Sequence, residues 1–203
     1  MPPARSRAGA EPAALGLRVR TGRIIVVLLA GPPDAPRVTW HDELEIFDPA
    51  LPETVMPWHQ ALELPPREGQ VVVRKAGKAV RALAARRVRD SLDRAAALGL
   101  RPRGAGIVVG SLLDPAEVSN DHMRAHAEEG RLSRVAVEEA LRAQRLSPQV
   151  LGEKEAWERA AAALGRSAGA LKRAVDVMGK QAGRPWRAHE KLAAVAAWVA
   201  LAD

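Results

Sequence analysis

The stretch LGLRVRTGRIIVVLLA, residues 15–30, contains two apolar runs separated by a Thr-Gly pair. Leu15–Arg20 suits a short strand, and Arg23–Ala30 has the β-branched, continuously apolar character of a buried strand. The Thr-Gly pair is a turn signal, so a hairpin is predicted. After the proline-rich loop 31–36, Arg37–Phe47 is predicted as a third strand with the imperfect alternation of an edge. Three consecutive strands with short connections predict an antiparallel meander.

The remainder of the chain alternates helices with short strands. Residues 48–69 contain five prolines and no clear periodicity, so they are predicted to form an irregular crossover. The predicted elements that follow are helix 71–98, strand 105–110, helix 114–144, strand 147–151 and helices 153–164, 170–181 and 187–201. The order β-β-β-α-β-α-β-α predicts an α/β fold, in which a mixed sheet carries helices on its faces, with extra C-terminal helices.

Length and composition narrow the class of protein. At 203 residues, the chain suits one domain over 14–203, with a helical part at 153–203 and a disordered N-terminal arm at 1–13. No apolar run reaches the ~20 residues of a membrane helix, so no membrane partner is predicted. The absence of cysteine excludes disulfides and thiolate metal sites and is compatible with a cytoplasmic location.

Positive charge is concentrated in one part of the chain. The net charge is +7, yet residues 74–103 alone contain ten basic and two acidic residues. This excess favours a nucleic-acid partner, and a solvated helix face is the alternative. The residues predicted to contact nucleic acid are Arg74, Lys75, Lys78, Arg81, Arg86, Arg89, Arg101 and Arg103. With no tyrosine and one phenylalanine, the composition argues against an aromatic platform for single strands.

Two histidines one turn apart mark the predicted helix 114–144. At 100° per residue, His122, His126 and Glu129 fall on the same side as the apolar residues, which predicts that all three face inward. Histidines at this spacing can share a divalent metal, with Glu129 as a third ligand or a base. The alternative is that the histidines lie at the rim of the helix–sheet interface and bond backbone carbonyls or Glu129. Gly130, unfavourable inside a helix, predicts close approach by another element.

Two stretches resemble a known family. The run LGLRVRTGRI, residues 15–24, is similar to the opening of RuvC-type Holliday-junction resolvases, where Leu-Gly-Ile-Asp-Pro-Gly precedes a second strand. His189-Glu190-Lys191-Leu192-Ala193-Ala194-Val195-Ala196 resembles the terminal helix of that family. The resemblance implies a ribonuclease H-like fold over nearly the whole chain. It also implies a nuclease site in which acids on the first strand, the fourth strand and the last helix hold two divalent metals.

The chain departs from the family at those acids. Arg18 stands where the resemblance places the first-strand acid, and Ser111 stands near the fourth-strand position, with Asp114 the nearest acid. Glu190 matches one acid of the last helix, although it could instead support the start of that helix, and Arg187 falls near the other. An arginine repels a metal ion, so the resemblance implies a degenerate two-metal site and points away from strong catalysis.

Three functions remain open at this level. The first is a nucleic-acid-binding ribonuclease H-like protein whose two-metal site is inactive. The second is a metal-dependent nuclease or phosphodiesterase whose chemistry has moved to His122, His126, Glu129, Asp114 and Glu190. The third is a protein-interaction scaffold, in which the C-terminal helices 153–201 bind a protein partner or a second copy of the chain.

Overall fold

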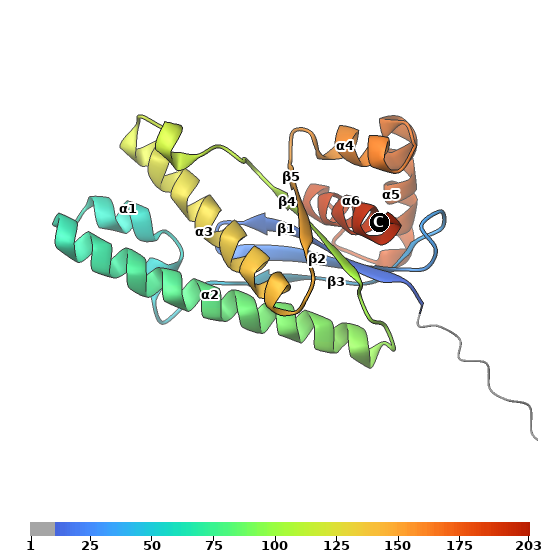
Figure 1. Cartoon of the computed structure of the whole chain (residues 1–203), viewed down its shortest axis with the longest axis horizontal. Helices are drawn as coiled ribbons and strands as arrows, with labels where there is room; N and C mark the ends of the chain where they lie inside the picture. The colour runs from blue at the N-terminus through green and yellow to red at the C-terminus, as the bar shows by residue number, and fades with distance from the viewer. Residues whose placement is uncertain (1–10) are drawn as a thin grey trace, which may run out of the picture.

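The strands of the computed structural model, which describes residues 11–203, form one five-stranded sheet in the order β3-β2-β1-β4-β5 (Figure 1). The strands are β1 (Ala13–Arg20), β2 (Arg23–Ala30), β3 (Arg37–Glu45), β4 (Gly104–Val109) and β5 (Pro148–Gly152). The first three form the predicted antiparallel meander, and β4 and β5 run parallel to β1. The C-terminal ends of β1, β4 and β5 therefore meet at one edge of the sheet, where ligands commonly bind in α/β proteins.

Helices cover both faces of this sheet. One face packs against α2 (Pro66–Ala97) and α3 (Asp121–Ala143), and the other against α4 (Ala156–Ala163), α5 (Ala168–Ala182) and α6 (Ala188–Ala202). A short helix, α1 (Pro57–Leu62), and two 3-10 turns, η1 (Pro52–Thr54) and η2 (Pro115–Glu117), complete the fold. The predicted order of elements, with its extra C-terminal helices, is confirmed.

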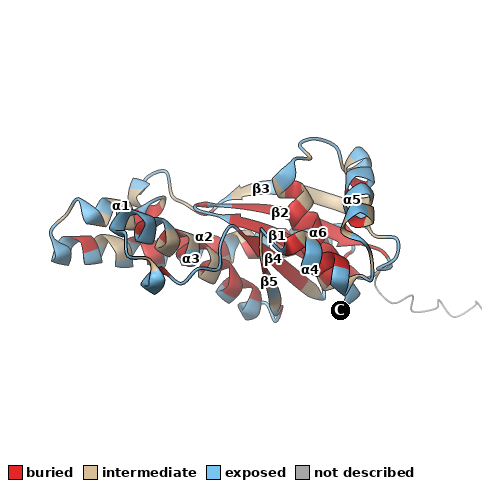
Figure 2. Ribbon diagram, turned by 90° about the horizontal axis from the view of Figure 1, so that it is seen from above, coloured by how far each residue is buried: buried red, intermediate tan, exposed pale blue. Residues whose placement is uncertain are grey.

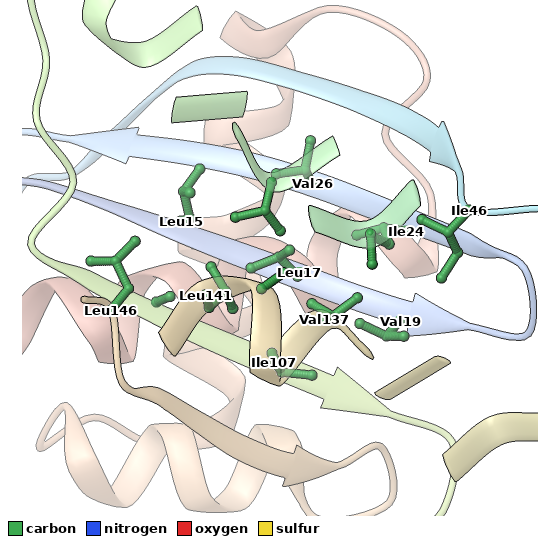
Figure 3. Close-up of a cluster of buried hydrophobic side chains, with 14 of the residues drawn as sticks. Leu15, Leu17, Val19, Ile24, Val26, Ile46, Ile107, Val137, Leu141 and Leu146 are labelled. Atoms are coloured by element: carbon green, nitrogen blue, oxygen red, sulfur yellow. The ribbon is translucent and has the colours of Figure 1, made fainter. Parts of the chain in front are cut away.

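Alternation along β1 divides its side chains between the two layers. Leu15, Leu17 and Val19 enter the core beneath α2 and α3 (Figure 3). The intervening residues Gly16 and Arg18 face the other layer, as the period of a strand requires. A Cβ at Gly16 would collide with the backbone of α6. The helix can therefore lie directly on the sheet only because this position has no side chain.

Several element boundaries differ from the predicted ones. The crossover 48–69 contains η1 and α1, and α2 begins at Pro66, because proline fits the first turn of a helix. The helix predicted from residue 114 begins at Asp121, where the Asn120 side chain accepts a hydrogen bond from the Met123 backbone N–H at 2.9 Å. β1 begins at Ala13, one residue before the predicted domain start, and residues 1–10 of the predicted arm lie outside the described residues.

The beginnings of α2 and α3, together with α1, extend past the sheet at the end toward which β1 points (Figures 1 and 2). We call this part the α1–α3 lobe; it comprises residues 57–80 and 121–131. Trp58 anchors α1 by packing against the core, and Ala61 lies so close to Gly69 of α2 that a Cβ there would be 3.0 Å from the Ala61 Cβ. Within the described residues, no helix has the length and apolarity needed to cross a bilayer.

Candidate functional site

A buried ion pair lies at the C-terminal edge of the sheet. The Arg18 side chain is only 6% exposed; its Nη2 donates to the Glu153 carboxylate and its Nη1 donates to the Val19 carbonyl at 2.6 Å. Glu153 follows β5 directly, and its backbone N–H donates to the Val109 carbonyl at 2.8 Å. The guanidinium therefore extends from β1 across the end of β4, next to Gly110. A buried cation therefore lies at the ends of β1 and β4, where the resemblance places metal-binding acids.

The surroundings of this pair are electropositive. Burial lowers the pKa of Arg18, and the carboxylate of Glu153 opposes that shift. Burial also lowers the pKa of His189, at the start of α6, and the positive charges of Arg20 and Arg18 lower it further. The Nδ1 atom of His189 is buried without a hydrogen-bond partner among the described residues.

Glu190 caps its own helix. Its Oε2 accepts a hydrogen bond from the Arg187 backbone N–H at 2.7 Å, which is the bond that a glutamate at the third position of a helix makes to the N-cap residue. The side chain is buried, so this bond satisfies an N–H that would otherwise be unpaired. The sequence-based interpretation of Glu190 as a residue that supports its helix is confirmed by this geometry.

Ser111 and Asp114 are engaged in local turns. The Ser111 hydroxyl accepts from the Leu113 N–H at 3.1 Å, and Asp114 accepts from the Ala116 N–H at 3.0 Å. The Asp114 carboxylate also lies 3.9 Å from Nη1 of Arg131. Neither acid of the predicted relocated site, Asp114 or Glu190, joins the histidines in a group that could share an ion.

A cavity of about 410 Å³ opens between the edge of the sheet and α3. Four arginines contribute to its wall, namely Arg18, Arg20, Arg131 and Arg134, and His126 lines it as well. No aspartate or glutamate lines it among the described residues. Three of the arginines have acidic partners outside the wall, whereas Arg20 forms no ion pair with any described residue. The cavity can therefore attract an anion.

Three histidines meet in the α1–α3 lobe. The ring of His59, on α1, contacts those of His122 and His126 on α3, with centroid distances of 4.7 and 4.2 Å. The centroids of His122 and His126 are 4.7 Å apart, and one ring nitrogen from each of the three lies within 4.8 Å of the others. These three side chains are close enough to share one metal ion.

Glu129 binds His59 and is almost completely buried. Its Oε1 accepts from the His59 Nδ1 at 2.8 Å and from the His59 backbone N–H at 3.2 Å. Its Oε2 lies 4.0 Å from Nδ1 of His126 and has no hydrogen-bond partner among the described residues. Glu129 is 1% exposed, so its predicted inward orientation is confirmed.

The predicted inward orientation of His122 and His126 is wrong. Both are exposed, and the His126 side chain retains 47% of its accessible surface. A helical wheel assumes that the sheet covers one face along the whole helix. The first turns of α3 lie beyond the sheet, so the sheet does not cover these two histidines. The predicted close approach at Gly130 is also wrong, since a Cβ there would have no described atom within 4 Å.

His59 is the residue that the sequence-based site omitted. It is 63 positions from His122 and lies in a six-residue helix inside a segment predicted to be irregular. Its sequence signal was weak: a Trp-His pair after Pro57, which starts the helix. Only the packing of α1 against α3 brings it to the other histidines.

All eight predicted nucleic-acid contacts are exposed. The six on α2 fall within about 140° of its circumference, opposite the buried residues that face α3 and the sheet. Lys75 and Arg81 pair with Glu53 and Glu139 at 3.3 and 3.0 Å, and the other six form no ion pair within the described part of the chain. We call Arg74, Lys75, Lys78, Arg81, Arg86 and Arg89 the α2 stripe.

The fold is similar to that of solved RuvC structures. The chain matches Thermus thermophilus RuvC in complex with a Holliday junction substrate with a TM-score of 0.54 and 13% identity, covering 92% of this chain and 90% of that one. A second T. thermophilus RuvC structure matches with a TM-score of 0.52 and 13% identity over 92% of both chains. No family model and no curated protein matches the sequence. The predicted ribonuclease H-like fold is thus confirmed.

Proposed function

We propose that this ribonuclease H-like protein binds the phosphodiester backbone of nucleic acid and lacks two-metal cleavage. The observation that carries the proposal is the cavity at the edge of the sheet, with four arginines and no acid in its described wall. Phosphate groups are the anions that such a wall and an extended basic helix face would attract together. A protein of this fold, T. thermophilus RuvC, has been solved with a Holliday junction, so branched DNA is the first ligand to test.

The edge of the sheet does not suit two magnesium ions. Mg²⁺ prefers oxygen ligands and bridges a phosphate between carboxylates. Here Arg18 is a buried cation, its carboxylate neighbour Glu153 is already paired with it, and Glu190 is bonded to a backbone N–H. An ion placed there would compete with the guanidinium for the same oxygens. These contacts support binding without cleavage.

The scaffold alternative has less support. Helices α4, α5 and α6 turn their apolar side chains toward the sheet. Among the large apolar residues that are exposed in the described chain, only Val177 belongs to the segment 153–201. A partner-binding surface would need a larger contiguous apolar patch.

Binding is tested by fluorescence anisotropy with a labelled four-way junction, duplex DNA, single-stranded DNA and RNA at several salt concentrations. We expect binding at low salt that weakens as salt rises, with a log–log slope of about −0.9 per phosphate contact on duplex DNA. Arg20→Glu with Arg131→Glu should weaken binding through the cavity. Arg74→Glu with Arg89→Glu should weaken it through the α2 stripe, and each pair should reduce the slope by about 2.

A matched control separates site contacts from net charge. Arg173→Glu with Lys180→Glu makes the same charge change on exposed positions of α5, in the opposite layer. This pair should leave the slope nearly unchanged. Absence of binding to all four ligands at low salt, or an equal loss in the control, would refute the proposal. The proposed lack of two-metal cleavage would be refuted if the protein cleaved any of these substrates with Mg²⁺ or Mn²⁺ and Glu190→Gln abolished that cleavage.

A further inference from the structure

The gathering of three histidines in the α1–α3 lobe is not explained by packing. His122 and His126 are exposed, so their rings could extend into solvent, yet both lie against His59 from another helix. The side chains of His122 and His126 make no hydrogen bond to any described residue. The three imidazoles therefore bring together ring nitrogen atoms that make no other bond and could serve as ligands.

Glu129 prepares His59 to act as a ligand. A carboxylate oxygen accepts from Nδ1 of His59, so the proton of the neutral ring is on Nδ1 and the lone pair is on Nε2. That Nε2 atom is buried and has no hydrogen-bond partner among the described residues. A carboxylate that holds the far side of a histidine is the usual outer partner of a metal-binding imidazole, where it fixes the tautomer and the ring orientation.

The type of donor indicates the type of ion. Three imidazole nitrogens with no thiolate suit zinc and its neighbours cobalt, nickel and copper. Magnesium and calcium need oxygen ligands, which none of the three histidines offers. Three protein ligands leave a fourth position of a tetrahedral ion for water or another oxygen ligand. Because His126 also lines the arginine cavity, an anionic oxygen is a ligand of suitable charge.

We propose that His59, His122 and His126 bind one zinc-type divalent ion, with Glu129 as the residue that positions His59. The site is separate from the acid positions of the sheet edge and does not depend on nucleic-acid binding. Metal content and anisotropy are measured separately, so either proposal can fail alone.

The test uses the full chain, freed of metal with a chelator and then titrated with Zn²⁺ by calorimetry. Co²⁺ is added in parallel, and its visible absorption spectrum reports tetrahedral coordination. We expect one Zn²⁺ per chain. Glu129→Gln, which keeps an oxygen that can accept from His59, should weaken Zn²⁺ binding by about 10- to 100-fold. His122→Ala and His126→Ala, at exposed positions that should not affect folding, should weaken it more.

His41→Gln is the matched control. His41 bonds the Ala182 carbonyl at 3.2 Å, a contact that a glutamine amide can replace, and it has no part in the cluster. This variant should bind one Zn²⁺ with unchanged affinity. The proposal is overturned if the wild-type protein takes up no Zn²⁺ or Co²⁺. It is also overturned if His126→Ala binds Zn²⁺ as tightly as wild type. If Glu129→Gln keeps full affinity and the Co²⁺ spectrum, its positioning role is refuted.

Discussion

Breaking the Arg18–Glu153 pair from its two ends should have unequal effects on stability. Arg18 is almost fully buried, whereas 41% of the Glu153 side chain is exposed. Glu153→Gln leaves a buried cation without its counter-charge. Removing one partner of a fully buried pair costs about 3–5 kcal/mol, and an exposed pair contributes at most about 1 kcal/mol. With one buried and one half-exposed partner, we expect Glu153→Gln to lower the free energy of unfolding by about 2 kcal/mol.

Arg18→Met should cost less. Methionine fills a similar volume with no charge to desolvate, and the carboxylate left behind can be hydrated through its exposed surface. Replacing a buried charge with an apolar side chain of similar size is often neutral or stabilising, so a change within about 1 kcal/mol is expected. In the Arg18→Met background, Glu153→Gln should then cost less than about 0.5 kcal/mol.

The four proteins of this double-mutant cycle are compared by urea denaturation, with the combined fluorescence of the five tryptophans, among them the fully buried Trp198, as a reporter. A loss of about 2 kcal/mol corresponds to roughly 4–8 °C in melting temperature for a chain of this size. If Arg18→Met destabilises as much as Glu153→Gln, or if the two effects simply add, the interpretation of Arg18 as a buried cation held by Glu153 is wrong.

Four further outcomes are expected from the structure. Because the folded protein lowers the pKa of His189 below 6.5 by burial and by the charge of Arg20, the unfolded chain binds more protons as the pH falls below about 6.5. The contribution of His189 to the free energy of unfolding should therefore be fully present above that pH and decline below it. Urea titrations between about pH 7.5 and 5 should show a smaller decline in that free energy for His189→Gln than for the wild-type protein. Gly106→Ala would place a methyl group against the backbone of α6 and should cost about 1–3 kcal/mol or more. Gly130→Ala, in open space on a helix, should instead stabilise by about 0.5–1 kcal/mol, and thermal melts compare the two. Zn²⁺ at 100 times its dissociation constant should raise the free energy of unfolding by about 2.7 kcal/mol, an increment that His126→Ala should abolish in the same melts.

Much of the fold could be predicted because it depends on patterns of local composition. Arg23–Ala30 is apolar at every position after its first and is buried on both faces, as predicted for a buried strand. The α2 stripe was equally visible, since ten basic residues in one region cannot all be covered. Boundaries were predicted less well where proline starts a helix, as at Pro66, because proline interrupts a pattern and yet fits the first turn.

The candidate site could be predicted only in part. The sequence identified Glu129, His122 and His126 as an unusual group, and the family resemblance placed Arg18 where relatives have an acid. It could not identify Glu153 as the partner of Arg18, because the two are 135 positions apart and meet only when β5 is placed beside β4.

The sequence alone determined the order of the elements and the charge of the α2 stripe, because both depend on residue type and local period. The tertiary structure decided which side chains meet. It placed His59 beside His122 and His126 and paired Glu129 with His59. It also left His122 and His126 exposed, because the first turns of α3 extend past the sheet, where the short helix α1 packs against them. Contacts between distant segments depend on how far each helix extends past its neighbours. A helical wheel shows which residues share a face of one helix and gives no information about that extent.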